Sequence, residues 1–434
     1  MAHYLLAASP LPGHVLPMLH IAADLRRRGH EVELLTSVDY DAAITASGAR
    51  AIALPDAAIP HPPELKLPRW MPRLMRGWLT GRADLRAVFI APLEQQHQAL
   101  RTAMDTKPVD AILVDVAFVG VLPLLLSDEP RPPVLVCGVA PLALSSVDTP
   151  PFGVGWQPMP NVNYDVMTRV VHRVMFAAIR RELDRTLHTT GRGRSPVFIT
   201  DWPVLADRVL QLTVPEFEYP RRDMPETVLF TGPVLPDPPP AQPVPDWWSD
   251  LDGPAAVILV TQGTWDNNDL DQLIGPTIEA LADQDCLVVA TTGRPTTRGP
   301  RLTAANARVV DYVPYGQLLP RVDVMITNGG YGGVHYALAH GVPLIVAGDT
   351  ADKPEIAARI AYIGAGIDMG TGRPTPRAIA AAVRRVLDTP DYRVAAQRMQ
   401  RRIATFDSLD TIHGVLRDVC HNGGMGLSTQ DSLD

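Results

Sequence analysis

The stretch TNGGYGGVHYALAHGVPL, residues 327–344, places four glycines within five positions where a strand pattern changes to a helix pattern. Apolar VDVMIT (322–327) precedes them, and VHYALAHG (334–341) is typical of a short helix that ends at Gly341. Clustered glycines are costly unless the main chain must approach another group closely, and we expect Gly332 to adopt a positive φ, which a β-branched residue would resist. The start of a helix has unpaired N–H groups and a positive dipole end, so this turn is suited to an anion, above all a phosphate.

The composition is typical of a globular enzyme or binding protein. Of the 434 residues, 46% are hydrophobic and 20% are charged, and a chain of this length usually forms two domains. The net charge of −8 argues against a nucleic-acid-binding protein, which usually has a basic excess. The three cysteines lie far apart, which is typical of a reducing compartment and provides neither a disulfide framework nor a zinc site. We therefore expect a cytoplasmic protein without an integral membrane segment, whose first residues form a strand and not a signal peptide.

A proline-dense linker, residues 232–254, divides the chain near its middle. On both sides of this linker, apolar strand patterns alternate with helix patterns. The predicted strands are 3–9, 31–37, 111–115 and 133–140 in the first half, and 255–263, 286–293, 307–313, 322–328 and 343–348 in the second half. This alternation predicts an α/β fold with two Rossmann-like, doubly wound domains, residues 1–231 and 255–434, the second of which ends in a helix and a tail. Two such domains would face a cleft at the carboxyl ends of their strands, where ligands bind.

Two common nucleotide-binding motifs are missing from the sequence. No G-x-G-x-x-G follows the first strand, where the sequence reads SPLPGHVLP (9–17), and no G-x-x-x-x-G-K-[ST] loop occurs. The sequence therefore argues against Rossmann-type NAD binding and Walker-type ATP hydrolysis. The glycine segment 329–333 lies in the second half without a P-loop lysine, which favours a diphosphate held by backbone amides alone.

Two long segments resemble a known family: GHVLPMLHIAADLRRRGHEVELLT (13–36) and VDYVPYGQLLPRVDVMITNGGYGGVHYALAHGVPLIVAGDTADKPEIAARIAYIGAGI (310–367). Together they resemble the inverting family-one glycosyltransferases of the UDP-glycosyltransferase type, in particular the bacterial natural-product branch. The resemblance implies the GT-B fold, with an acceptor-binding first domain and a nucleotide-sugar-binding second domain. It also implies transfer of a sugar, such as glucose or a deoxyhexose, from a UDP- or dTDP-sugar to a hydroxyl of a hydrophobic small molecule, with no cofactor besides this co-substrate.

The resemblance implies a set of donor-binding residues, all in the second half of the chain. They are Gly263, Thr264, Tyr312, Val313, Asn328, Gly330, Gly332, Gly333, Asp352 and Lys353. Three positions depart from the family pattern: Asn328 replaces a histidine, Tyr336 a ribose-binding glutamate, and Lys353 the glutamine of an Asp-Gln pair. Asn328 can donate a hydrogen bond to a phosphate but carries no charge. The single hydroxyl of Tyr336 cannot bind a ribose diol as a carboxylate does, which leaves both UDP and dTDP open.

Ordinary structural roles also stay open at some of these positions. Tyr312 takes the place of the family's base-stacking tryptophan, beside Val313, whose backbone could face the base; it could equally be a core aromatic at a strand end. Gly263 and Thr264 follow a strand, and they could form a simple turn in place of a diphosphate contact.

The candidate catalytic residues lie in the first half. His14 follows the first predicted strand, and imidazole, with an ordinary pKa of about 6.5, is suited to take the proton of an acceptor hydroxyl. The chain has twelve histidines, so position alone does not identify the base. The resemblance implies that His14 is the base, and Asp115, which ends the run AILVD, is the candidate to orient it. An aspartate after a strand can equally cap the helix that follows.

We expect no metal ion at this site. Two D-x-D triplets, Asp250/Asp252 and Asp283/Asp285, lie in the linker and at a helix end, and we interpret both as solvated surface. The departing diphosphate would then be stabilised by backbone amides and a helix dipole.

A candidate acceptor-binding helix follows a proline-rich loop. In RWMPRLMRGWLTG (69–81), Trp70, Leu74 and Trp78 recur at i, i+4 and i+8, as on one face of an amphipathic helix. Three roles remain open for this helix: core packing, a wall of a hydrophobic acceptor pocket, and peripheral contact with a membrane.

Two other classes of function remain possible on this fold. A catalytically silent GT-B homologue that helps a partner enzyme is favoured by Asn328, Tyr336 and Lys353, but opposed by His14 and the glycine segment. A nucleotide-sugar hydrolase or epimerase would need further acid/base groups, for which the sequence offers no candidates. The oligomeric state is not predicted.

Overall fold

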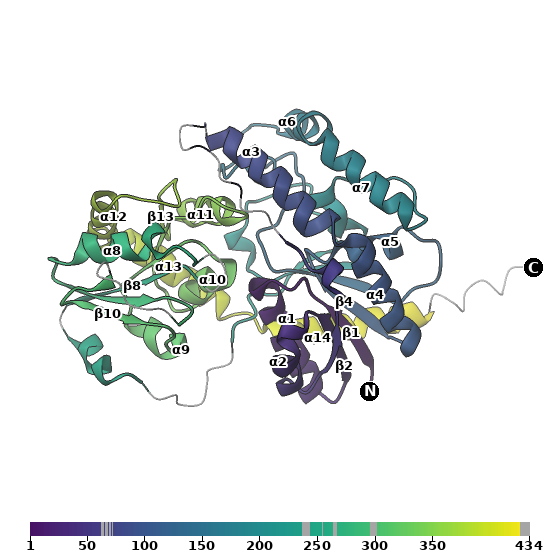
Figure 1. The fold of residues 1–434 in the computed structure, drawn as a ribbon, viewed down its shortest axis with the longest axis horizontal. Coiled ribbons are helices and arrows are strands. Elements are labelled where there is room, and N and C mark those ends of the chain that lie inside the picture. The colour runs from purple at the N-terminus through teal and green to yellow at the C-terminus, as the bar shows by residue number, and fades with distance from the viewer. Residues whose placement is uncertain are drawn as a thin grey trace, which may run out of the picture.

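The computed structural model of the protein describes residues 1–61, 65, 68, 71, 73–236, 244–253, 255–263, 267–295 and 302–425. Within these residues the chain forms two parallel β-sheets, one in each half, flanked by helices (Figure 1). The predicted α/β fold with two doubly wound sheets is confirmed.

The first sheet has seven parallel strands in the order β3-β2-β1-β4-β5-β6-β7. The strands are β1 (His3–Ala7), β2 (Glu31–Thr36), β3 (Arg50–Ala53), β4 (Ala111–Asp115), β5 (Val134–Gly138), β6 (Arg208–Gln211) and β7 (Val228–Phe230). β1 pairs with both β2 and β4, so the loops after β1 and β4 lie side by side at one edge of the sheet. All residues of β1, β4 and β5 are buried, as their unbroken apolar sequences predict for strands covered on both faces.

Helices cover both faces of this sheet. They are α1 (Pro12–Arg27), α2 (Asp41–Ala46), α3 (Arg73–Asp84), α4 (Leu93–Thr106), α5 (Leu122–Leu125), α6 (Asp165–Val170) and α7 (Ala177–Thr189), with π-helical turns η3 (Leu85–Ile90) after α3 and η5 (Val171–Met175) after α6. A proline in its first position starts α1 with the φ that a helix needs. This start places His14 in the first turn of α1, directly beyond β1.

The second sheet has six parallel strands in the order β10-β9-β8-β11-β12-β13. The strands are β8 (Ala256–Thr261), β9 (Cys286–Thr291), β10 (Ala307–Val310), β11 (Val324–Thr327), β12 (Leu344–Val346) and β13 (Gly366–Asp368). The helices are α8 (Ile274–Leu281), α9 (Tyr315–Leu318), α10 (Tyr331–Ala339), α11 (Lys353–Tyr362), α12 (Pro376–Asp388) and α13 (Pro390–Ile403). β11 pairs with both β8 and β12, so the turns after these three strands lie at the same edge.

The last helix that the structure describes, α14 (Ser408–Met425), returns to the first half (Figure 1). Ile412 and Leu416 are buried in the apolar cluster that also contains Val15 of α1. Arg28, directly after α1, forms an ion pair of 3.0 Å with Asp410 of α14. The predicted second domain, residues 255–434, includes this helix in sequence, but in space α14 lies on the first sheet's helix layer.

Candidate active site

His14 and Asp115 contact each other at the edge where β1 and β4 end. The Nδ1 atom of His14 lies 2.5 Å from Oδ1 of Asp115, whose side chain is fully buried. The amide of Ser9 donates to Oδ2 at 2.6 Å, and the amide of Ala117 donates to Oδ1 at 2.7 Å. The carboxylate of Asp115 therefore binds both the imidazole and the turn directly after β4. Asp115 does not cap the next helix, which begins at Val119 after Phe118 and has no side-chain cap. An acceptor on Nδ1 favours the neutral tautomer with its proton there, which leaves Nε2 free to accept a proton.

Charges from both halves of the chain act on His14. Burial lowers the pKa of the His14 imidazole. The charge and hydrogen bond of Asp115 and the charge of Asp352 together raise it by more than burial lowers it, so the pKa lies above its ordinary value of 6.5. Asp352 lies directly before α11 in the second half. Burial raises the pKa of Asp352, whereas His14 and Lys353 act to lower it. The structure thus brings the predicted base of the first half together with a predicted donor-binding residue of the second half.

The glycine segment forms the turn from β11 into α10. Gly329 has a φ of +91°, and a Cβ added there would lie 2.8 Å from Cγ1 of Val346, so this position requires glycine. Gly330 precedes the first residue of α10, and Gly332 and Gly333 lie in its first turn. A Cβ at Gly330 or Gly332 would meet no heavy atom within 4 Å in the described structure. The main chain here is open to its surroundings, as a phosphate-binding turn requires.

One expectation for this segment is wrong. Gly332 does not have a positive φ, because α10 starts at Tyr331 and includes Gly332, three residues before the predicted helix start. Gly329 is the residue of this segment that adopts a positive φ.

The turns after β8, β9, β11 and β12 pack closely on one another. Gly263, with a φ of +69°, accepts a hydrogen bond from Nδ2 of Asn267 at 2.9 Å. A Cβ added to Gly293 would lie 2.2 Å from the Gly263 carbonyl oxygen, and one added to Gly348 would lie 2.0 Å from that of Asn328. The positive φ of Gly263 is by itself a structural reason for glycine at this position, whether or not Gly263 also contacts a diphosphate. Thr264 lies outside the described residues.

Asn328 and Lys353 are both buried beside these turns. Nδ2 of Asn328 donates to the carbonyl of Gln262 at 2.7 Å, which joins the ends of β8 and β11. Nζ of Lys353 donates to Oγ1 of Thr350 at 2.9 Å. The loop before α11 also contains Ala351 with a φ of +50°, a backbone conformation that is uncommon outside glycine and that is often found at functional sites.

Tyr312, Val313 and Tyr336 occupy the region predicted to bind the nucleoside. Tyr312 is not a core aromatic, because its side chain is 64% exposed, and its hydroxyl donates to the carbonyl of Gly293. Base stacking by Tyr312 stays a prediction. Val313 and Tyr336 are partly buried against the apolar cluster of α10 and α11.

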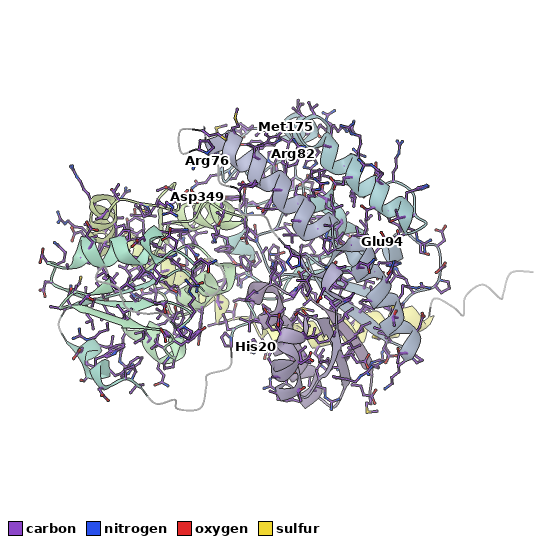
Figure 2. All side chains as sticks on the ribbon, in the orientation of Figure 1. His20, Arg76, Arg82, Glu94, Met175 and Asp349 are labelled. Atoms are coloured by element: carbon purple, nitrogen blue, oxygen red, sulfur yellow. The ribbon has the colours of Figure 1, made fainter. Side chains whose placement is uncertain are left out.

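The predicted acceptor helix is α3, and among its described residues Leu79, Arg82 and Ala83 line a cavity. Trp70 lies outside the described residues, as does the side chain of Leu74. Trp78 is partly buried; its Nε1 donates to the carbonyl of Met175 at 3.3 Å, and the guanidinium of Arg82 lies 5.0 Å from its ring centre. Figure 2 labels Arg82 and Met175, the two residues that Trp78 contacts. Trp78 therefore joins α3 to the turn before α7 and is not among the described cavity-lining residues.

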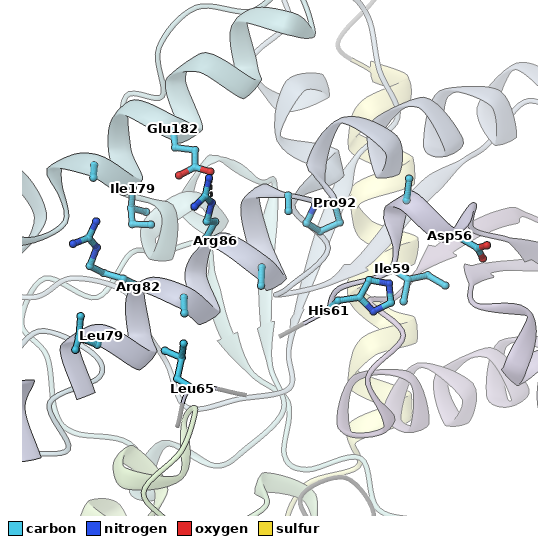
Figure 3. A pocket seen from close by; sticks show the side chains of 15 residues that line it. Asp56, Ile59, His61, Leu65, Leu79, Arg82, Arg86, Pro92, Ile179 and Glu182 are labelled. Carbon is cyan, nitrogen blue, oxygen red and sulfur yellow. Dashed lines mark ion pairs between the residues drawn. The ribbon is translucent and has the colours of Figure 1, made fainter. Parts of the chain in front are cut away.

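A cavity of about 660 Å³ lies between the later part of α3, η3, α7 and the loop after β3 (Figure 3). Its lining is mainly apolar, with Ile59, Leu79 and Ile179 among its residues. Arg86 and Glu182 form an ion pair of 2.7 Å at its wall. The sequence pattern identified the helix, but it could not show which of its faces lines a cavity.

The structure also answers two questions about metals and membranes for the residues it describes. Within this part of the chain, no group of three His, Cys, Asp or Glu side chains is arranged to hold a metal ion. Asp250 pairs with Arg308 at 2.7 Å, and Asp252 pairs with Arg321 at 3.1 Å, while Asp283 and Asp285 are exposed. None of the described helices is long and apolar enough to cross a membrane.

Sequence reasoning missed the polar contacts that join the two halves next to this site. Oγ1 of Thr213, which follows β6, lies 2.5 Å from Nε2 of the buried His335 on α10. Gln211 donates through Nε2 to the hydroxyl of Tyr331, within the glycine segment, at 3.1 Å. Such contacts leave no periodic signal in a sequence, because each pairs residues more than a hundred positions apart.

Comparisons with known proteins agree with this geometry. Residues 276–410 match the model of the erythromycin biosynthesis protein CIII-like C-terminal domain. The chain is 39% identical to 4'-demethylrebeccamycin synthase of Lentzea aerocolonigenes, over 96% of this chain and 100% of the relative. It is 32% identical to UDP-glycosyltransferase 2 of Phaeomoniella chlamydospora, over 94% of each chain.

Solved structures show the same fold. The glycosyltransferase of kitacinnamycin matches with a TM-score of 0.74 at 21% identity, over 96% of this chain and 99% of that chain. The glycosyltransferase VinC, solved in complex with dTDP, matches with a TM-score of 0.63 at 19% identity, over 97% of this chain and 100% of that chain.

Two facing parallel sheets of this kind define the GT-B glycosyltransferase fold. The chain belongs to the family-one glycosyltransferases of the UDP-glycosyltransferase type, within their natural-product branch. The predicted enzyme class, a nucleotide-sugar-dependent hexosyltransferase, is confirmed.

Proposed function

We propose that the enzyme transfers a hexose, glucose or a deoxyhexose, from a UDP- or dTDP-sugar to a hydroxyl of a hydrophobic small molecule, with inversion at the anomeric carbon and with His14 as the base. The observation that carries this proposal is the contact of 2.5 Å between His14 Nδ1 and the buried Asp115, beside Asp352 of the opposite half. A histidine held in one tautomer, with Nε2 free, is the arrangement that proton removal from a hydroxyl needs.

The reaction would be a single displacement. The acceptor hydroxyl would give its proton to Nε2 of His14 as its oxygen forms a bond to the anomeric carbon of the sugar. The bond from that carbon to the nucleotide's β-phosphate oxygen would break on the opposite face, and its electron pair would leave with the diphosphate. Attack opposite the leaving group inverts the configuration. Asp115 would stabilise the imidazolium formed in this step.

The turn between β11 and α10 is suited to hold the diphosphate. The N–H groups of Gly330, Gly332 and Gly333 belong to the start of a helix, where the helix dipole stabilises negative charge. The open space over Gly330 and Gly332 leaves room for phosphate oxygens. We infer that these amides take the role that a metal ion has in other glycosyltransferases, and that the enzyme needs no cofactor beyond its nucleotide sugar.

Asp352 would bind the donor sugar, and the cavity under α3 would bind the acceptor. Asp352 lies beside His14 and can accept hydrogen bonds from hydroxyls of the donor sugar. The cavity of about 660 Å³ is within the usual range of small-molecule pockets, roughly 300–1,000 Å³, and its mainly apolar lining suits a hydrophobic acceptor.

A panel of nucleotide sugars tests this proposal without knowledge of the acceptor. UDP-glucose, dTDP-glucose, dTDP-rhamnose and the two free diphosphates are added to the purified enzyme, and the melting temperature is measured. At least one nucleotide sugar should raise the melting temperature by mass action, and the same compound should release its nucleotide when phenolic acceptors are supplied. Binding without transfer to any acceptor would instead favour a catalytically silent homologue.

A further inference from the structure

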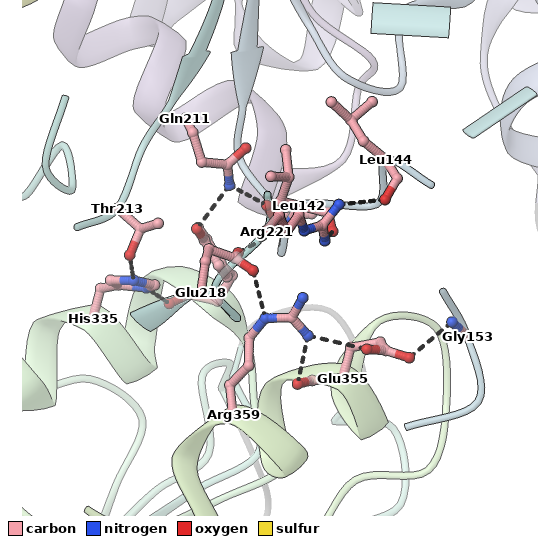
Figure 4. Close-up of polar contacts among 12 residues, drawn as sticks. Leu142, Leu144, Gly153, Gln211, Thr213, Glu218, Arg221, His335, Glu355 and Arg359 are labelled. Carbon is pink, nitrogen blue, oxygen red and sulfur yellow. Dashed lines mark hydrogen bonds and ion pairs between the residues drawn. The ribbon is translucent and has the colours of Figure 1, made fainter. Parts of the chain in front are cut away.

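A buried charge network joins the two halves of the enzyme beside α11 (Figure 4). Arg359 of α11, whose side chain is 1% exposed, donates from Nε to Oε2 of Glu218 at 2.8 Å. Its Nη1 donates to Oε2 of Glu355, one turn earlier on the same helix, at 3.0 Å. Glu218 belongs to the first half, so Arg359 spans the interface between the halves.

Backbone amides of the first half bind the remaining oxygen of each glutamate. Oε1 of Glu218 accepts a hydrogen bond from the amide of Leu142 at 2.8 Å. Oε1 of Glu355 accepts from the amides of Gly153 and Gly155, each at 2.8 Å. Every carboxylate oxygen of the network therefore has a partner, which is the condition under which buried charges are tolerated.

A second guanidinium lies next to this network. Arg221 donates to the carbonyls of Leu142 and Leu144, and the charges of Glu218 and Asp223 act on it. Burial lowers the pKa of Arg359, but Glu218 and Glu355 raise it by more, so this guanidinium stays charged. Removal of one member would leave an uncompensated buried charge in the interface, which is strongly destabilising in proteins.

The loop that carries Gly153 and Gly155 packs tightly on the first turns of α11. Gly155 has a φ of +64°, and a Cβ added there would lie 2.8 Å from Cβ of Pro354. Nε2 of Gln157 donates to the carbonyl of Ala358 at 3.2 Å. Apolar surfaces can slide over each other, whereas these directional contacts are satisfied in one register of α11 only.

The register of α11 matters because of what lies at its start. Asp352 lies directly before the first residue of α11. Glu355, in the first turn of α11, follows Asp352 by three positions. The charge of Asp352 acts on His14 of the first half. Any displacement of the first turn of α11 would therefore change the distance between Asp352 and His14.

We propose that Glu218, Glu355 and Arg359 are positioning residues, which hold the first turn of α11, and Asp352 with it, against His14 across the two halves. The catalytic meaning of this arrangement rests on the proposed role of His14 as the base. The network would set the geometry between the donor-binding helix and the base without contact with either substrate.

A titration of His14 in the resting enzyme tests the proposal. Histidine is ¹³C-labelled, the His14 resonance is assigned from its loss in His14→Ala, and its pKa is measured by NMR in wild type, Glu355→Gln and Arg359→Gln. These variants change the local charge in opposite directions. A direct field effect would lower the pKa of His14 in Glu355→Gln and raise it in Arg359→Gln. Displacement of Asp352 would lower it in both, and this is the result that we expect.

A matched control is Asp323→Asn. Asp323 also binds an arginine, Arg393, and a backbone amide, that of Val257, but these contacts lie within the second half. It should lower the melting temperature and leave the pKa of His14 unchanged. A pKa that stays at the wild-type value in both network variants, or that moves in opposite directions, would overturn the proposal.

The result can be separated from the proposed function and from misfolding. A His14→Ala enzyme that kept its activity would refute the catalytic base, yet it would not alter the titration of the resting enzyme. If the two network variants do not fold, as judged by near-UV circular dichroism, the same titration is made on Gln157→Ala. This variant changes no charge and removes only the contact with Ala358. An unchanged pKa of His14 in folded Gln157→Ala would then overturn the proposal.

Discussion

Nδ1 of His14 lies 2.5 Å from Oδ1 of Asp115, although the two residues are 101 positions apart in the sequence. The contact exists because β1 and β4 are neighbours in the parallel sheet, so that the turn after β1 and the last residue of β4 meet at the same edge. Two backbone amides fix the carboxylate, and the carboxylate fixes the imidazole. Most of the expected behaviour of the enzyme follows from this pair and from the open turn at the start of α10.

The first prediction concerns pH. A histidine base must be unprotonated, so kcat/KM should fall as the pH is lowered through the pKa of His14. Because Asp115 and Asp352 raise this pKa, the acidic limb should lie above pH 6.5. In Asp115→Asn the limb should move to lower pH, and kcat should fall by about 10²–10⁴, because the asparagine no longer fixes the tautomer. An acidic limb that stayed in place in this variant would contradict the assignment of the pair.

The raised pKa of His14 also predicts that its contribution to stability falls as the pH rises, whereas activity rises with pH. His14 binds its proton more tightly when folded, so its contribution is fully present below the unfolded pKa of about 6.5 and is lost as the pH rises through the folded pKa. Among folded variants, His14→Gln should remove this part of the pH dependence of unfolding.

The second prediction concerns the glycine segment. Gly332→Val places a branched side chain in the open space over the start of α10, so nucleotide affinity measured by calorimetry should fall at least about tenfold, equivalent to ~1.4 kcal/mol. The melting temperature without ligand should change much less. Gly414→Val is a matched control, since Gly414 is also a helical glycine whose added Cβ would meet no heavy atom within 4 Å in the described structure. A folded Gly332→Val enzyme with normal affinity would show that the diphosphate binds elsewhere.

The third prediction concerns metal ions. If backbone amides and the helix start hold the diphosphate, transfer measured after treatment with EDTA should proceed at the untreated rate. Restoration of a lost rate by Mg²⁺ or Mn²⁺ would show that a metal takes part in the reaction.

The fourth prediction concerns His335, which contacts Thr213 between the two halves. Burial lowers the pKa of His335 to about 4, so the neutral form is favoured in the folded state. Its contribution to stability is present above the unfolded pKa and is lost as the pH falls from about 6.5 towards 4, by about 3 kcal/mol at most.

Urea unfolding at pH 7 and pH 5 measures this effect. His335→Gln should be less sensitive to acid than the wild type, although His172, whose pKa burial also lowers to about 4, should keep part of the sensitivity. Equal sensitivity in variant and wild type would mean that His335 titrates normally.

All nine predicted strands are present, because parallel strands buried on both faces leave long apolar runs in the sequence. β3, β6, β7 and β13 are not among the predicted strands. β3, β7 and β13 lie at sheet edges, and charged or polar residues interrupt the apolar run in β3 (RAIA), β6 (RVLQ) and β13 (GID). The positions of His14, Asp115 and Asn328 at or beyond strand ends could be predicted, because each ends or follows an apolar run; their roles come from the family resemblance and stay predictions.

Other parts of the site depend on contacts that a sequence does not reveal. Arg359 and Glu355 have the spacing of an ordinary exposed helical ion pair, and only the packing of the first half over α11 buries them. The sequence leaves Tyr312 either as a core aromatic or as a base-stacking residue, and only the structure shows that its side chain is exposed. The periodicity of Trp70, Leu74 and Trp78 predicts a helix, yet Trp78 is not among the described cavity-lining residues, because tertiary packing decides which face of a helix is turned inwards.

The most direct test of the account is the rate of His14→Ala with the nucleotide sugar that binds best. His14 is predicted to take the acceptor proton and to make no major contribution to donor binding. The variant should therefore bind the nucleotide sugar with nearly the wild-type affinity, while kcat falls by about 10²–10⁴. A folded His14→Ala enzyme that transfers sugar at the wild-type rate would contradict the proposed mechanism.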